Sequence, residues 1–578
     1  MLKRLAKCVR EYKLAAILTL VFIVGEALIE TQIPTIMADL VNGIKDGAGQ
    51  DVLLREGIRL AIMAVISLAC GGLAAYTCAK ASAGFAKNLR HDLFDRIQTF
   101  TFANIDKFSS SSLVTRMTTD VSNVQMSFMM IIRTAIRCPL MLIFSIIMAY
   151  RMGGALATSF IVIIPVLVTG LVLISRKAMP AFRSVFRKYD RLNESIEENV
   201  RGMRVVKGFS REEYEKEKFG RAADDICRDF TRAERIVALN TPLMQICLYF
   251  NMAFVLLVGS KLAITGGKVD VGQLSAMLTY GMQILMSLMM LSMVYVILTI
   301  SAESSKRIYE VLEEIPDLAD PADPVCEIAD GSIDFEGVSF KYSEKAKNFS
   351  LSNVDLHIRS GMTVGVIGGT GSSKSSLVQL IPRLYDATEG VLRVGGVDVR
   401  DYRIESLRNA VAMVLQKNLL FSGTIKENLR WGNPDATDEE LIEACKLSQA
   451  HDFVMSFPDG YDTVIEQGGT NVSGGQKQRL CIARALLKKP KILILDDSTS
   501  AVDTKTDALI RAGFKTYIPE TTKIIIAQRI ASVEDADLIV VMDQGRIQAA
   551  GTHGELLKTS EIYREVYEQQ TSGGDGNE

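Results

Sequence analysis

The stretch Met362-Thr-Val-Gly-Val-Ile367 leads directly into Gly368-Gly-Thr-Gly-Ser-Ser-Lys-Ser375, and the apolar segment Ser376-Leu-Val-Gln-Leu-Ile381 follows it. This order of strand, glycine-rich turn and helix start is typical of a phosphate-binding loop. In such a loop backbone N–H groups and the helix dipole meet the phosphates, while Lys374 supplies charge and the Ser375 hydroxyl ligates Mg²⁺. The sequence therefore predicts an ATP and Mg²⁺ site that contains Gly368, Gly369, Thr370, Gly371, Ser372, Ser373, Lys374, Ser375 and Ser376.

The surrounding sequence has the pattern of an α/β nucleotide-binding domain. Short alternating strands start after Gly331, and alternating strands and helices follow. One later segment, Lys491-Ile-Leu-Ile-Leu-Asp496, predicts a buried strand that ends in a Mg²⁺-binding acid. We assign residues 331–570 to this α/β P-loop domain. The preceding residues 306–330 form a proline-containing linker, and the tail, 571–578, has a composition that predicts disorder.

The first half of the chain predicts a membrane domain. A hydrocarbon core of about 30 Å takes roughly 20 helical residues, and six apolar stretches are long enough. They are 14–36, 57–80, 128–150, 154–175, 241–264 and 273–300. Long polar connections, 81–127 and 176–240, have the helical spacing of intracellular extensions. Residues 1–305 are thus expected to form an all-α six-helix transmembrane domain with long intracellular helices.

The N-terminus carries information on orientation. Basic residues precede the first apolar stretch, which places the N-terminus in the cytoplasm. We expect a multi-pass protein of the plasma membrane whose C-terminus is also cytoplasmic. A signal peptide is the alternative. We favour a retained helix, because the stretch is long, contains Glu26 and Glu30, and lacks a small-residue cleavage site.

Ionisable residues inside the spans are costly, so Glu26, Glu30, Arg133 and Arg137 are expected to face the bundle interior or a wet cavity. Substrate contact, pairing between helices and a position nearer the interface all remain open. Several methionines in the sixth span suit an adaptable apolar surface, although methionines in membrane helices more often serve packing or lipid contact.

Composition excludes some partners. The net charge is −2, with 65 basic and 67 acidic residues, so no basic excess indicates nucleic acid. Nine cysteines are scattered without metal-type spacing, which favours reduced thiols in a chain that faces membrane and cytosol.

The segment Val472-Ser-Gly-Gly-Gln-Lys-Gln-Arg479 resembles the signature of the ATP-binding cassette superfamily, with Val472 where leucine is usual. Other motifs follow in the order of half-size exporters with six membrane spans. They are Tyr342 for adenine stacking, Gln416 in the Q-loop, Asp496 in Walker B and Ser500-Ala-Val-Asp503 in the D-loop. The fragments Ser112–Asp120 and Gly202–Glu212 match the coupling-helix regions.

This resemblance implies roles for the matched residues. In the family each ATP lies between the Walker motifs of one domain and the signature of the other. The resemblance therefore implies that Ser473, Gly474, Gly475 and Gln476 serve a partner's nucleotide in trans, and that Ser375, Gln416 and Asp496 hold Mg²⁺.

Three positions depart from the family pattern around this chain's own nucleotide. Ser373 replaces a glycine, and positive φ costs serine more, so a slightly reshaped loop is expected. Asp497 stands where the catalytic glutamate is usual, and its carboxylate falls short by roughly one carbon–carbon bond, about 1.5 Å. Gln528 stands where the family has a histidine that contacts the γ-phosphate, and an amide cannot become cationic.

The sequence thus resembles the degenerate-site subunit of heterodimeric bacterial multidrug exporters. We expect an ATPase and translocase that binds ATP but hydrolyses it slowly, with a second half-transporter as its partner in the lipid bilayer. A homodimer with two slow sites and an ATP-gated, channel-like regulator are the alternatives. We expect the exported substrate to be a hydrophobic small molecule, drug or lipid, and a peptide also fits.

Overall fold

A computed structural model describes residues 2–266, 269–344, 346–497 and 502–572. The chain divides into two compact units, the first running to Glu314 and the second beginning at Ile315. One short segment, Phe100–Phe108, belongs to the second unit although the sequence on both sides of it belongs to the first.

The first unit is entirely helical in the residues described, because a helix satisfies its own backbone hydrogen bonds in hydrocarbon. Six segments are long and apolar enough to cross a membrane, which confirms the six-span prediction: Arg10–Lys45, Gln50–Gln98, Ser110–Gly153, Thr158–Phe182, Glu212–Thr265 and Val271–Glu313. Its helices are α1 (Leu2–Lys7), α2 (Lys13–Lys45), α3 (Gln50–Gln98), α5 (Ser110–Thr115), α6 (Val121–Ile132), α7 (Thr134–Gly153), α8 (Thr158–Arg201), α9 (Met203–Gly208), α10 (Glu212–Val237), α11 (Asn240–Gly266) and α12 (Val271–Glu313).

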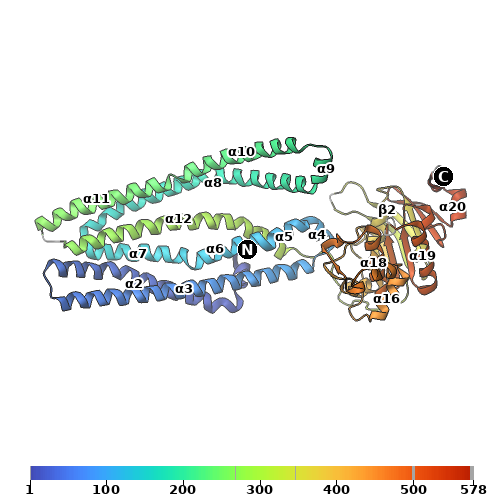
Figure 1. Cartoon of the computed structure of the whole chain (residues 1–578), viewed down its shortest axis with the longest axis horizontal. Helices are drawn as coiled ribbons and strands as arrows, with labels where there is room; N and C mark the ends of the chain where they lie inside the picture. The colour runs from blue at the N-terminus through green and yellow to red at the C-terminus, as the bar shows by residue number, and fades with distance from the viewer. Residues whose placement is uncertain (1, 267–268, 345, 498–501, 573–578) are drawn as a thin grey trace. The chain divides into compact units, whose positions relative to one another are not determined.

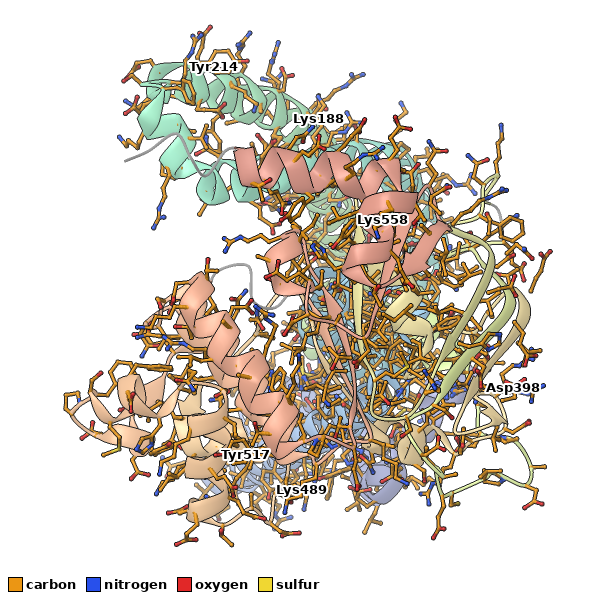
Figure 2. All side chains as sticks on the ribbon, turned by 90° about the vertical axis from the view of Figure 1, so that its right-hand side faces the viewer. Lys188, Tyr214, Asp398, Lys489, Tyr517 and Lys558 are labelled. Carbon is orange, nitrogen blue, oxygen red and sulfur yellow. The ribbon has the colours of Figure 1, made fainter. Side chains whose placement is uncertain are left out.

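Several helices continue well beyond their apolar stretches, as the polar connections predict. Figure 1 shows α8 running alongside α10 and α11. An ion pair of 2.7 Å between Lys188 and Asp229 joins α8 to α10, and Figure 2 shows Lys188 and Tyr214 on this helix pair. Helix α12 ends at Glu313, past the expected start of the linker at residue 306.

Three of the four ionisable residues expected inside the spans form a cluster between α2 and α7. Arg137 lies 3.2 Å from Glu26 and 2.5 Å from Glu30, which are one helical turn apart. This is the pairing between helices that the sequence left as one alternative. Arg133 is not part of it: this exposed residue lies at the junction where α6 ends and α7 begins.

The two polar fragments have different structures. Gly202–Glu212 contains α9, a short helix between α8 and α10. Ser112–Asp120 spans the end of α5 and a π-helical turn, and its last residue, the buried Asp120, accepts hydrogen bonds from Arg307 of α12. The short helix that groups with the second unit is α4 (Phe102–Phe108), which comes before this fragment rather than within it.

The second unit contains two larger sheets and a small one, which agrees with the predicted α/β class. The main sheet has the order β12-β11-β3-β10-β9-β6, in which only β12 is antiparallel to its neighbour. Its strands are β3 (Thr363–Gly368), β6 (Val411–Val414), β9 (Ile492–Asp496), β10 (Thr522–Ile526), β11 (Leu538–Asp543) and β12 (Arg546–Gly551). The central strands are almost continuously apolar, as strands covered on both faces require.

The other strands form an antiparallel sheet and a two-stranded ribbon. The sheet has the order β2-β1-β4-β5, and the ribbon pairs β7 with β8. Their bounds are β1 (Ile333–Phe340), β2 (Leu351–Ile358), β4 (Glu389–Val394), β5 (Val397–Asp398), β7 (Gly423–Thr424) and β8 (Val464–Ile465).

Helices cover the sheets and supply the ends from which the site is built. They are α13 (Lys374–Leu380), α14 (Ile404–Ala410), α15 (Ile425–Arg430), α16 (Asp438–Leu447), α17 (His451–Met455), α18 (Gly474–Leu487), α19 (Thr504–Tyr517), α20 (His553–Thr559) and α21 (Glu561–Ser572). The last helix includes Thr571 and Ser572, the first two residues of the predicted tail, and the rest of that tail lies outside the described residues.

Candidate nucleotide site

The phosphate-binding loop connects β3 to α13. Gly368 has no room for a side chain, because a Cβ there would lie 2.2 Å from the carbonyl oxygen of Met542. Gly371 and Ser373 both have positive φ, +83° and +71°. The serine thus adopts the left-handed backbone that glycine would give, at a cost of roughly 1–2 kcal/mol, and the expected change of loop shape is not seen at this residue.

Lys374 closes over the loop from the first turn of α13. Its ammonium group donates to the carbonyl oxygens of Gly368 and Gly369, both at 2.8 Å, and to the Ser372 hydroxyl at 3.3 Å. Burial lowers the pKa of Lys374, and the nearby charges of Asp497 and Asp496 oppose this effect. The loop's cation therefore lies beside the glycine-rich segment that the sequence assigns to the phosphates.

Ser375 and Asp496 come together although they are far apart in the sequence. The hydroxyl of Ser375 donates to Asp496 Oδ1 at 3.0 Å, because the end of β9 lies beside the start of α13. Burial raises the pKa of Asp496. A hydroxyl and a carboxylate oxygen are the hard ligands that Mg²⁺ prefers, so this pair fits the ion that the sequence predicts.

Asp497 is the centre of a hydrogen-bonded group. Its Oδ2 accepts from the Gln528 amide at 2.8 Å and from the Gln416 amide at 3.3 Å. Only 9% of Asp497 is exposed, and its backbone has a positive φ of +48°. Asp497 and Gln528, two of the three departures from the family pattern, are therefore in direct contact.

A cavity of about 500 Å³ joins these groups. Its lining includes residues of the loop, Gln416, both aspartates and Gln528. Three further lining residues were not predicted as site residues: Ile367, Ile526 and Val566 of α21. Tyr342 lies beside the same helix start: its hydroxyl is 2.8 Å from Ser376 Oγ and donates to Gln379 Oε1 at 3.1 Å. Tyr342 is 46% exposed, as a residue that stacks on a ligand requires.

Comparison with known proteins decides the family. The model described as the ABC transporter transmembrane region matches residues 16–288, and the model described as ABC transporter matches residues 351–500. The uncharacterized ABC transporter ATP-binding protein YfiB of Bacillus subtilis is 36% identical over 98% of both chains. The chain belongs to the ABC transporter family. It is a half-size exporter with six membrane spans.

Two further relatives place the chain within this family. The ATP-dependent lipid A-core flippase of Aromatoleum aromaticum is 32% identical over 92% of this chain and 88% of its own. A solved structure of a bacterial Atm1-family ABC exporter with ATP bound covers 99% of both chains with a TM-score of 0.84 and 24% identity. The first likeness extends through membrane and ATPase regions, and the second shows the fold.

The ABC signature is intact but lies apart from the cavity. Ser473 caps α18: its hydroxyl accepts from the backbone N–H of Gln476 at 3.3 Å, and the backbone N–H of Ser473 donates to Gln476 Oε1 at 2.8 Å. None of the residues from Ser473 to Gln476 lines the cavity. In the D-loop, Ser500 and Ala501 lie outside the described residues, and Asp503 caps α19 through the amide of Thr506.

The structure adds a polar residue that the sequence did not predict, Gln570. Gln570 of α21 donates from its amide to the carbonyl oxygen of Gln528 at 2.8 Å and accepts from the backbone amide of Ile530 at 2.8 Å. The final helix thus fixes the backbone of the segment that carries Gln528. No local motif marks Gln570, and the segment next to it has a composition that predicts disorder.

Proposed function

We propose that this ABC transporter is one subunit of a heterodimeric exporter whose own Walker site binds ATP and Mg²⁺ but hydrolyses ATP slowly. Its signature, Ser473–Gln476, completes an efficient site on a different half-transporter. Binding of ATP closes the pair, the long intracellular helices transmit the closure, and the substrate leaves on the outer side of the plasma membrane.

The residues around the loop support ATP and Mg²⁺ binding. Backbone N–H groups at the start of α13 and the ammonium group of Lys374 are suited to phosphate oxygens. Ser375, Asp496 and Gln416 would hold Mg²⁺, which supplies charge neutralisation between the β- and γ-phosphates. Tyr342 would stack on the adenine ring.

The contact between Gln528 and Asp497 carries the proposal of slow hydrolysis. A base must reach the attacking water to about 2.6–3.2 Å, and aspartate is shorter than the usual glutamate by about 1.5 Å. The Asp497 oxygen also accepts hydrogen bonds from two amides. Gln528 cannot supply the positive charge that a protonated histidine brings to a γ-phosphate. The site therefore retains its binding groups while its catalytic groups are weakened.

The intact signature supports a distinct partner. The three departures, Ser373, Asp497 and Gln528, surround this chain's own nucleotide, whereas the signature that serves the other nucleotide keeps its capped serine. In a homodimer both sites would be weakened and the intact signature would complete only slow sites. In a heterodimer it completes a site in which the partner provides glutamate and histidine.

The membrane unit supports a hydrophobic substrate such as a drug or a lipid. A cavity of about 310 Å³ between α8 and α12 is lined mainly by Val168, Leu171, Val172, Leu288 and Leu291. Met282, Met286, Met290 and Met293 are exposed along α12. Their spacing places them on one face, where flexible thioethers adapt to ligands of different shape. The basic N-terminus favours cytoplasmic termini.

ATPase turnover tests the asymmetry. The purified chain is assayed alone and with the half-transporter encoded beside it, and the double variant Asp497→Glu with Gln528→His is assayed in both states. We expect negligible turnover alone, restoration by the partner, and a gain on the order of a hundredfold at the repaired site, as a positioned base contributes. Robust turnover by the unaltered chain alone would overturn the heterodimer proposal and favour a homodimer.

Transport in sealed vesicles tests whether ATP hydrolysis drives movement of the substrate. The expected result is substrate uptake that scales with ATP hydrolysis and stops when the partner's catalytic acid is replaced by glutamine. A nucleotide-gated flux that survives this replacement would contradict export and favour the channel-like alternative.

A further inference from the structure

The N-terminal helix α1 forms one wall of a cavity of about 770 Å³ in the first unit. The last turns of α3 and α12 form the other walls, on the side of the membrane that carries the N-terminus. Two hydrogen bonds of 2.9 Å hold α1 in place: the Asn88 amide of α3 donates to the carbonyl oxygen of Cys8, and Arg4 donates to that of Leu312 in α12. The cavity is therefore part of the packed unit.

Most of the charges that line this cavity are positive. The basic lining residues are Lys3, Arg4, Lys7, Arg10 and Arg96, and the acidic ones are Asp92, Asp95 and Glu313. Five positive against three negative charges leave a formal excess of +2. A concave site with an excess of one sign attracts ligands of the opposite sign.

Two of the three acidic residues are already engaged by neighbouring groups. Glu313 pairs with Arg4. Both carboxylate oxygens of Asp92 accept hydrogen bonds, Oδ1 from Arg10 at 2.6 Å and Oδ2 from the Cys8 thiol at 3.5 Å. These pairs tie α1 and the turn after it to α12 and α3, and they use up two of the five basic groups.

The other three basic residues, Lys3, Lys7 and Arg96, have no ion-pair or hydrogen-bond partner among the residues that the structure describes. The third acid, Asp95, lies 2.8 Å from His91 instead. Lys3 and Lys7 are four residues apart, so they share one face of α1 and repel each other. The Nε of Arg96 is buried without an acceptor. Because a guanidinium stays charged and only donates, an anion in the cavity would satisfy it.

The position of Arg96 along α3 indicates a soluble ligand. Arg96 lies about 24 Å further along the helix than residue 80, where the apolar stretch 57–80 ends. The headgroup layer on each side of the hydrocarbon core is only about 5–8 Å thick. Lipid headgroups therefore end well before Arg96. The cavity is also larger than the nucleotide cavity of about 500 Å³, so it has room for more than a single phosphate.

We propose that this cavity binds a small soluble polyanion with two or more phosphate groups, held by Lys3, Lys7 and Arg96. The planar guanidinium of Arg96 matches the oxygens of a phosphate, and the two lysines supply charge from the opposite wall. The ligand would join α1 to the end of α3 and leave the pair of Arg4 and Glu313 intact. The inference goes beyond the proposed export activity and depends neither on a distinct partner nor on slow hydrolysis.

Calorimetric titration of the full-length chain in phosphatidylcholine nanodiscs tests the proposal, with inorganic tripolyphosphate as the probe. Saturating AMP-PNP with equimolar Mg²⁺ fills the nucleotide site, so that the heat reports binding elsewhere. We expect one tripolyphosphate per chain, with an affinity that falls as salt is added, because salt screens exposed charges. Inorganic phosphate should bind at least about tenfold more weakly, since it reaches fewer of the charged donors.

Variants identify the groups that hold the probe. Arg96→Gln should weaken tripolyphosphate binding about tenfold or more, as should Lys3→Gln combined with Lys7→Gln. Arg90→Gln is the matched control, because Arg90 is exposed on the same helix and does not line the cavity. Its affinity should stay within about twofold of the unaltered chain. Because Arg96 has no partner to lose, Arg96→Gln should also keep the thermal unfolding midpoint of the unliganded chain, which separates binding from folding.

Three results would overturn the inference: no tripolyphosphate binding at low salt, equal weakening in Arg90→Gln and Arg96→Gln, or equal affinities for phosphate and tripolyphosphate. Nanodiscs that contain anionic phosphatidylglycerol distinguish the source of the phosphate groups. At 0.1 M salt the affinity should remain within about twofold, because the site is further from the membrane than the Debye length of about 10 Å. Loss of tripolyphosphate binding in these nanodiscs would mean that lipid headgroups occupy the cavity, and the assignment to a soluble ligand would be wrong.

Discussion

The side-chain amide of Gln528 donates a hydrogen bond of 2.8 Å to Asp497 Oδ2. These residues occupy the positions where the family has a histidine and a glutamate. A histidine would contact the γ-phosphate, whereas this glutamine is directed toward the neighbouring carboxylate. In this contact the Gln528 amide donates to the carboxylate that occupies the position of the catalytic base. The contribution of Asp497 to turnover can therefore be tested by substitution.

Asp497→Asn should reduce ATPase activity of the assembled transporter by less than about twofold. The substitution keeps the size of the side chain and removes a base that contributes little if the site is already slow. Gly475→Asp in the same chain is the contrasting variant, because its signature is proposed to serve the efficient site. It should reduce turnover at least about tenfold, since it introduces a charge at the start of α18.

Steady-state ATPase assays of both variants, reconstituted with the partner, measure this asymmetry. Equal and severe losses in the two variants would mean that Asp497 is a working catalytic acid, and the proposal of a slow site would then be wrong.

Gln570→Ala should loosen the segment that carries Gln528. The wild-type side chain makes two hydrogen bonds of 2.8 Å to this backbone, and each contributes about 1 kcal/mol. Amide hydrogen exchange at Ile530 should accelerate about fivefold or more. In the background with Asp497→Glu and Gln528→His, kcat should fall while KM for ATP changes little.

The neighbouring Gln569 provides the control for this prediction. It is exposed on the same helix, so Gln569→Ala removes an identical side chain without touching the segment. Equal exchange rates in the two variants would show that the final helix does not hold Gln528 in place.

Gln570 also illustrates where sequence reasoning stops. The loop, Asp496 and the signature were predictable because each chemical role demands particular residues at fixed spacing within a strand–turn–helix context. The amide of Gln570 reaches Gln528 only after α21 has packed against the turn at Ile530–Ser532. Nothing in the local sequence of a polar terminus encodes that contact, so tertiary packing alone reveals it.

Ser373 and the intramembrane charges are two further features that the sequence predicted only in part. The sequence identified the cost of serine in place of glycine, but whether the backbone would yield depended on the surrounding loop, which holds φ at +71°. The apolar stretches predicted six spans because hydrocarbon permits few alternatives. The partner of Arg137 depended on how α2 and α7 are rotated, which hydropathy does not specify.

Arg137→Met should destabilise the membrane unit. It would leave Glu26, whose side chain is only 14% exposed, and Glu30 without their common cation. Removal of one partner from a buried pair costs about 3–5 kcal/mol, because the remaining charge is uncompensated. The triple variant Glu26→Gln, Glu30→Gln and Arg137→Gln should recover most of the loss.

Thermal unfolding in detergent measures this effect, with Arg133→Met as the control. Arg133 is an exposed arginine of the same span and lies outside the cluster. Unchanged thermal stability in Arg137→Met, combined with loss of transport, would contradict a structural role and assign the cluster to substrate contact.

Burial should divide the cysteines of the second unit into reactive and inert groups. Burial raises the pKa of Cys445 to about 12, so at pH 8 its thiolate fraction is on the order of 10⁻⁴. Because the thiolate is the nucleophile, its maleimide reaction should rise about tenfold per pH unit up to that pKa. Cys326 is exposed and should react readily at pH 8. Mass spectrometry after brief labelling should therefore lose one adduct in Cys326→Ser and none in Cys445→Ser, whereas both thiols should react in guanidinium chloride. Equal labelling of the two thiols in the folded chain would mean that the helical part around α16 opens on the timescale of the reaction.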